Sequence, residues 1–260
     1  MTAPAPVELT LVRGVATLTV RGAKRLNVVG SETLTALIAA GERLRAEPGL
    51  RLVLVTGEGE RAFIGGADID EMAGLAPDTA REFITRVHQA NHTFRALPVP
   101  SIALIRGYCL GAGMELAAAC DLRLGSEDST YGMPEVQVGL PSVVEAGLLP
   151  SLIGWGKTRE LLYTGSLIDA AEAERIGFLQ KVAPGDRLRE AAQPWIEAIL
   201  AADPAAIRTQ KRLIESWLDS GIGAGILNSI DAFAATYQSD APKRRMEEWR
   251  ARQRERKKSP

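Results

Sequence analysis

The sequence contains little cysteine and histidine, and it has no long apolar run without charges. Its 260 residues include only two cysteines, Cys109 and Cys120, which excludes a disulfide-stapled secreted scaffold. We expect both to be buried, reduced thiols. No uncharged apolar stretch reaches the roughly 18 residues that a membrane span requires, and the N-terminus lacks the basic and apolar regions of a secretory signal. These absences predict a soluble protein of the cytoplasm.

A strong overall charge of either sign is also missing. The net charge is -1, so the overall balance favours neither a nucleic-acid partner nor a membrane. The exception is residues 243–258, where nine Lys or Arg accompany three Glu. A basic run of this kind is usually a solvated helix face or tail. It leaves one alternative open, a non-catalytic scaffold that binds RNA through this segment.

The first part of the chain alternates strand and helix patterns. Residues 7–12 and 15–20 alternate around an Arg-Gly pair, which predicts a hairpin with a two-residue turn. Ser31 can cap a helix whose apolar residues recur every three or four positions, and a Pro-Gly pair ends that helix. The next expected elements are a strand at 51–55, a helix at 80–97 and a strand at 100–105. This order predicts an α/β fold with right-handed crossovers.

The last part of the chain has a helical character. Strand patterns nearly disappear after residue 158, where only 178–182 is clear. Asp203 followed by Pro204 is the signature of a helix start, with Asp as the N-cap and Pro in the first turn. Three helices are then expected, at 204–218, 222–237 and 242–257. We place a soft boundary near residue 195, between an α/β core at 1–195 and a helical region at 196–260.

Two loops share a design in which an apolar strand is followed by small residues and a helix start. They occupy residues 63–69 and 110–115. Small residues let a ligand approach the backbone, and the first turn of a helix leaves peptide N–H groups unpaired. Two such groups directed at one carbonyl oxygen would form an oxyanion hole. Glu115 and Glu135 accompany these loops in a mostly apolar segment, where a carboxylate is seldom buried without a partner or a task.

Three ordered motifs carry a family resemblance. AFIGGADIDEM, GYCLGAGMELAAACD and YGMPE occur in this order, together with KRLN and LVLVTG, and they resemble the enoyl-CoA hydratase/isomerase (crotonase) superfamily over most of the chain. The resemblance implies a core of ββα spiral turns and C-terminal helices that build a trimer, often doubled to a hexamer. It implies an acyl thioester of coenzyme A as the substrate, with no further cofactor and no metal.

The resemblance also implies roles for individual residues. The amides of Ala67 and Ala112 match the positions that hold the thioester oxygen, and Glu115 and Glu135 match the two catalytic carboxylates of hydratases. Substrate or coenzyme A binding is expected at Arg25, Gly66, Asp68, Ile69 and Gly111. The implied reaction adds water across the 2,3 double bond of an acyl-CoA, or removes it. Other reactions of this fold, double-bond isomerisation or C–C cleavage, remain alternatives.

In the hydratase hypothesis, Glu115 is the base that activates water and Glu135 is the acid that protonates C2. The developing enolate would rest on the two loop amides. Purely structural roles are the alternative. Glu115 would then pair with a cation such as Arg123, and Glu135 would cap its loop.

One segment departs from the family pattern. Residues 141–147, PSVVEAG, stand where the family has a glycine-rich run, so Ser142 replaces a glycine whose backbone helps to hold the water in hydratases. Glu145 adds a third carboxylate near the expected acyl pocket. It is either a surface glutamate or an inward-pointing group that changes the substrate or the reaction. His88 and His92 lack a carboxylate at zincin spacing, so we expect packing or surface histidines rather than a metal site.

Overall fold

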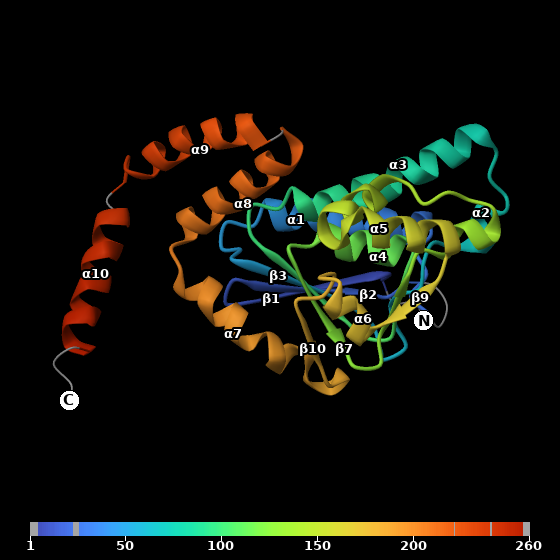
Figure 1. The fold of residues 1–260 in the computed structure, drawn as a ribbon, viewed down its shortest axis with the longest axis horizontal. Helices are drawn as coiled ribbons and strands as arrows, with labels where there is room; N and C mark the ends of the chain where they lie inside the picture. The colour runs from blue at the N-terminus through green and yellow to red at the C-terminus, as the bar shows by residue number, and fades with distance from the viewer. Residues whose placement is uncertain (1–4, 23–25, 221, 240, 257–260) are drawn as a thin grey trace. The chain divides into compact units, whose positions relative to one another are not determined.

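A computed structural model of the chain describes residues 5–22, 26–220, 222–239 and 241–256 (Figure 1). The chain forms two compact units, residues 1–196 and 197–260. The first is a mixed α/β unit and the second is helical. Among the described residues, no helix is both long and apolar enough to cross a membrane.

The main sheet of the first unit has six strands in the order β1-β2-β3-β5-β7-β10. Their bounds are β1 Val7–Val12, β2 Val15–Val20, β3 Leu52–Gly57, β5 Ser101–Ile105, β7 Leu122–Ser126 and β10 Lys181–Ala183. Only β1 is antiparallel to its neighbour, and the remaining pairs are parallel. β3 and β5 are buried at most positions, as expected for strands of a parallel sheet with covered faces.

The predicted hairpin is confirmed. β1 and β2 pair from Val7 with Val20 to Val12 with Val15, which leaves two residues in the turn. Both turn residues have positive φ, 49° for Arg13 and 81° for Gly14. Such a turn matches the twist of the flanking strands.

A second, smaller sheet has the order β4-β6-β8-β9. Its bounds are β4 Ala62–Ile64, β6 Tyr108–Leu110, β8 Thr130–Gly132 and β9 Leu167–Asp169. β9 was not predicted, because its three residues are too few to show a period. The strand expected at 178–182 lies at 181–183 instead, since the buried Phe178 and Leu179 belong to the core before the strand begins.

Three helices, α1 Ser31–Arg45, α3 Pro77–Arg95 and α4 Ala112–Ala119, lie on one side of the main sheet (Figure 1). α1 packs against α3, and a Cβ at Gly41 would collide with Thr93. The prediction that Ser31 caps α1 was wrong. Gly30 is the N-cap, and Ser31 is bonded to Glu71 of the short helix α2, Ile69–Met72.

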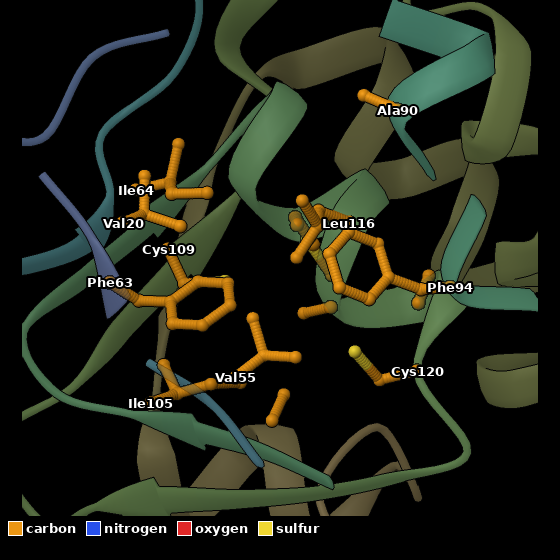
Figure 2. Close-up of a cluster of buried hydrophobic side chains, with 14 of the residues drawn as sticks. Val20, Val55, Phe63, Ile64, Ala90, Phe94, Ile105, Cys109, Leu116 and Cys120 are labelled. Atoms are coloured by element: carbon orange, nitrogen blue, oxygen red, sulfur yellow. The ribbon is translucent and has the colours of Figure 1, made fainter. Parts of the chain in front are cut away.

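A hydrophobic core joins both sheets to these helices, and Figure 2 shows one cluster of it. Phe63 of β4 and Val55 of β3 lie close to Leu116 of α4 and Phe94 of α3 in that view. The two cysteines of the chain are free and buried in this core, as expected. Burial raises the pKa of the Cys109 thiol well above its usual value.

The first unit also contains α5 Leu149–Thr164, α6 Ala170–Arg175 and a 3₁₀ turn η3 at Gly185–Arg187. The boundary between the units at residue 196 falls within α7, Leu188–Ala201. The second unit contains α8 Pro204–Asp219, α9 Ile222–Thr236 and α10 Ala241–Arg256, close to the predicted ranges. The predicted start of α8 is confirmed, since Asp203 accepts hydrogen bonds from the amides of Ala205 and Ala206. α8 and α9 pack together.

Candidate active site

A cavity of about 190 Å³ opens beside the second sheet. It is lined by residues of α2, α3 and α4, of the two glycine loops, and of the 3₁₀ turn η1, Pro134–Val138, with the segment after it. Most of these side chains are apolar. Among the described residues that line the cavity, Glu115 and Glu135 are the only titratable ones.

The first glycine loop follows β4 and is tied to the chain at 26–29. The Gly65 amide donates to the Leu26 carbonyl at 2.8 Å. Val29 donates to Gly66 at 2.9 Å and accepts from Asp68 at 3.0 Å, so these bonds fix the residues on both sides of Ala67. Gly66 has a φ of 118°, which a residue with a side chain rarely adopts. Ala67 itself faces the cavity.

The second glycine loop joins β6 to α4. Gly111 has a φ of 51°, and a Cβ at this position would collide with the carboxylate of Glu135 and lie 4.0 Å from Gly66 Cα. The two loops therefore lie side by side at the cavity. Ala112 is the first residue of α4, where the helix offers no acceptor for the peptide N–H. Ala67 and Ala112, predicted from separate parts of the sequence, thus line one cavity.

Glu115 lies in the first turn of α4 and is only 4% exposed. The pKa of its carboxyl is raised to about 8. Burial is the largest cause, and the charges of Glu135 and Glu145 also raise the pKa. The Ala146 amide donates to the Val143 carbonyl at 2.9 Å. The backbone N–H groups of Ala146 and Val143 lie close enough to the Glu115 carboxyl to lower its pKa. Burial and the two like charges outweigh the two donors, so the net shift of the Glu115 pKa is upward.

Arg123, the proposed structural partner of Glu115, has other acceptors. Its guanidinium donates to the carbonyls of Phe178 at 2.6 Å and Cys120 at 2.7 Å, and to that of Ala117 at 3.3 Å. It also lies over the Phe178 ring. These contacts satisfy the donors of the buried guanidinium without an ion pair to Glu115.

Glu135 is the second residue of η1, directly after a proline that starts the turn. Ser142 donates a hydrogen bond to Glu135 Oε2 at 2.7 Å. Ser142, which replaces a family glycine, therefore contributes its side chain to the site rather than only its backbone. Both residues line the cavity.

Glu145 points inward, which settles the orientation that the sequence left open. It lies in the 3₁₀ turn η2, Val144–Leu148, and is 4% exposed. Its Oε1 is 2.8 Å from His88 Nδ1, and its Oε2 accepts from Asn91 Nδ2 at 3.1 Å. Glu145 does not line the cavity, and its charge acts on Glu115, which does. The sequence analysis missed Asn91, although its position three residues after His88 places both on one helix face.

The expected coenzyme A contacts are placed as follows. Arg25 lies outside the described residues. Asp68 caps α2, accepting a bond from the Asp70 amide at 3.0 Å. Ile69 is exposed at the rim of the cavity, and Gly66 and Gly111 line it. Contact of these residues with a ligand stays a prediction.

Comparisons with known proteins show the family of the chain. The profile of the Enoyl-CoA hydratase/isomerase family matches residues 11–258. The crotonyl-CoA hydratase of Syntrophomonas wolfei is 32% identical over 232 residues, 89% of each chain. The short-chain-enoyl-CoA hydratase of Clostridium acetobutylicum is 30% identical over 230 residues, 88% of each chain.

A crystal structure of an enoyl-CoA hydratase from Bacillus anthracis superimposes with a TM-score of 0.89 at 28% identity, covering 95% of this chain and 96% of that one. The chain belongs to the enoyl-CoA hydratase/isomerase family, and its first unit has the crotonase fold that the motifs predicted.

Proposed function

We propose that the protein is an enoyl-CoA hydratase, which adds water across the 2,3 double bond of an acyl-CoA or removes it. The observation that supports this most is the pairing of Glu115 with Glu135 in one cavity, beside the two loops that carry Ala67 and Ala112. Adding water requires one group to accept a proton and another to give one. Two carboxylates beside a pair of backbone donors provide these functions.

The chemistry divides between the two parts of the site. The amides of Ala67 and Ala112 hold the thioester oxygen. The two carboxyls share one proton, and in the reactive form of the pair that proton is on Glu135. Ionised Glu115 then takes a proton from water, whose oxygen bonds to C3. The electron pair of the double bond moves toward the thioester, giving an enolate on the two amides. Protonated Glu135 then delivers its proton to C2, so the pair ends with one proton, as it began.

The cavity supports an apolar acyl group as the substrate. No lysine, arginine or histidine lies among the described residues that line it, and the side chains from α2 and α3 are Ile69, Met72, Phe83, Ile84 and Val87. A second carboxylate on the acyl chain would be desolvated there without a partner, at a cost of several kcal/mol. We therefore expect unsubstituted or alkyl-substituted enoyl groups to be preferred over dicarboxylic ones.

Double-bond isomerisation is the second candidate. One carboxylate moves a proton between C2 and C4 in that reaction, and no water is added. The segment at 141–147 favours it, because Ser142 stands where the resemblance implies a glycine that helps to hold the water, and the same segment adds the buried carboxylate of Glu145. C–C cleavage of an acyl-CoA is a further alternative, which the segment at 141–147 supports less.

A substrate panel tests these proposals. Crotonyl-CoA, longer and branched enoyl-CoAs and glutaconyl-CoA are each followed by the loss of the conjugated thioester absorbance, and the product is identified by mass. Gain of one water supports the hydratase. Conversion of 3-enoyl-CoA to the 2-enoyl isomer, without hydration, would support the isomerase instead. Turnover of none of these compounds, together with salt-sensitive RNA binding, would favour the non-catalytic scaffold.

We also propose that the helical second unit builds a homotrimer or a dimer of trimers. α9 exposes Ile226, Leu227, Ile230 and Phe233, and an exposed apolar face of this kind usually marks an interface. Light scattering during gel filtration gives the assembly directly. A monomer at micromolar concentration would contradict this.

A further inference from the structure

Glu145 is a buried carboxylate for which the catalytic proposal has no use. Its side chain is 3% exposed, yet it does not reach the cavity where the acyl group would lie. A buried carboxylate costs stability unless it is paired and hydrogen-bonded. Glu145 has a donor on each oxygen, His88 at 2.8 Å and Asn91 at 3.1 Å. Both oxygens of this buried carboxylate therefore have a hydrogen-bond partner.

The bonds from Glu145 join η2 to α3. His88 and Asn91 belong to α3, and Glu145 belongs to η2, which packs against both α3 and α4. The same turn presents the backbone N–H groups of Val143 and Ala146 to the carboxyl of Glu115. The anchor on α3 therefore sets where those two donors lie.

The backbone of the turn is strained, which indicates that something holds it in place. Val144 has a φ of 42°, a left-handed conformation that is an outlier for a β-branched residue. Such conformations are energetically costly and persist only where the surroundings over-determine them. The two bonds to Glu145, the next residue, supply that restraint.

We propose that Glu145 is a positioning residue for the reaction. Held by His88 and Asn91, it fixes the η2 turn against α4, so that the Val143 and Ala146 amides lie beside Glu115, and it places a further negative charge beside that carboxyl. This inference rests on the proposed role of Glu115. It assigns Glu145 no contact with the substrate.

The charge of Glu145 and the donors of its turn act on Glu115 in opposite directions. The charge raises the pKa of Glu115 and the two amides lower it. The titratable groups that face Glu145 are His88 from α3 and Glu115 from α4, with Glu135 of η1 beyond Glu115. On α5, which also packs against η2, Lys157 and Glu160 pair with each other at 2.8 Å.

Glu145→Gln tests the charge. The variant keeps the size of the side chain, so we expect the turn to hold and the alkaline fall of kcat/KM to move to lower pH by about one unit, since one of two like charges is gone. KM should change less than kcat. A profile that superimposes on the parent's, in a folded variant, would overturn the proposal.

His88→Gln and His88→Leu test the anchor, and they remain informative if Glu145→Gln does not fold, because His88 is half exposed. Gln can still donate to Glu145 and should keep most of the activity. Leu cannot, and we expect kcat to fall roughly tenfold to a hundredfold as the turn shifts. Gln89→Leu, at the exposed position next to His88 on the same helix, is the matched control and should change nothing. Equal activities for the Gln and Leu variants would contradict the anchor.

A wild-type protein without turnover would overturn the hydratase proposal but not this one. Titration of the Glu115 carboxyl by carbon NMR then gives the answer directly. A lower midpoint in Glu145→Gln than in the parent supports the positioning role, and an unchanged midpoint removes it.

Discussion

Ser142 donates a hydrogen bond of 2.7 Å to Oε2 of Glu135. The bond crosses from the segment after η1 back to its first turn, so it fixes the carboxylate that we propose as the C2 acid. Ser142→Ala removes it, and we expect kcat to fall by roughly fivefold, the equivalent of about 1 kcal/mol for one hydrogen bond. Steady-state kinetics on crotonyl-CoA measure this. Ser151→Ala, which loses only an exposed bond to a backbone carbonyl, should retain the parent rate.

The two catalytic carboxyls have a direct test. Glu115→Gln and Glu135→Gln each remove one proton-transfer group, and we expect each to lower kcat by at least about 10²-fold. Thermal unfolding of each variant shows whether the fold persists. Glu127→Gln, an exposed glutamate after β7, serves as the control and should keep full activity. A folded Glu115 or Glu135 variant at near-parent rate would remove that residue from the mechanism.

The shared proton predicts a specific pH profile. The pKa of Glu115 is raised to about 8, chiefly by burial, so the pair of carboxyls retains one proton through neutral pH. Loss of that proton leaves no acid for C2, and kcat/KM should fall as the pH rises through about 8. Hydration takes up no net proton, so the dehydration of 3-hydroxyacyl-CoA should show the same fall. Opposite profiles for the two directions would contradict a shared proton.

The sequence predicted the parts of the site that depend on local pattern. The glycine loops precede Ala67 and Ala112, and both loops reach one cavity because β4 and β6 are neighbours in a sheet. The hairpin and the start of α8 were also readable, since two-residue turns and Asp-Pro caps are local signals. Only the resemblance to a family connected Glu115 with Glu135, because their distance depends on tertiary packing.

The sequence did not predict the contacts that cross between elements. His88 and Glu145 are 57 residues apart, and no local signal indicates that they bond. Serine is a favoured N-cap residue, but the Ser31 hydroxyl donates a hydrogen bond to the carboxylate of Glu71, and Gly30 is the N-cap. Tertiary contacts decided both outcomes. They give Glu145 a partner in His88, and they give the Ser31 hydroxyl a partner in Glu71 in place of the helix amides.

Gly111 offers a steric test of the site. Its φ of 51° and the carboxylate of Glu135 leave no room for a Cβ. Gly111→Ala should therefore displace Glu135 and the start of α4, and we expect at least roughly a hundredfold loss of kcat/KM, as for other misplacements of reacting groups. Gly59→Ala is the control: it also has a positive φ, 75°, but open space surrounds it, so the change strains the backbone without touching the site. Equal losses in the two variants would attribute the effect to strain alone.

The raised pKa of Glu115 also predicts how stability depends on pH. Between its ordinary value of 4.5 and about 8, the folded protein keeps a proton that the unfolded chain has lost. Raising the pH in this window therefore favours unfolding, by up to roughly tenfold in the equilibrium constant per pH unit from this group. Glu115→Gln carries no such proton, so its stability relative to the parent should increase from pH 5 to pH 8 and then level off. Urea unfolding of both proteins at several pH values measures this difference. A difference that is flat with pH would show that Glu115 titrates near its ordinary value, and the single shared proton on which the catalytic proposal depends would then lie elsewhere.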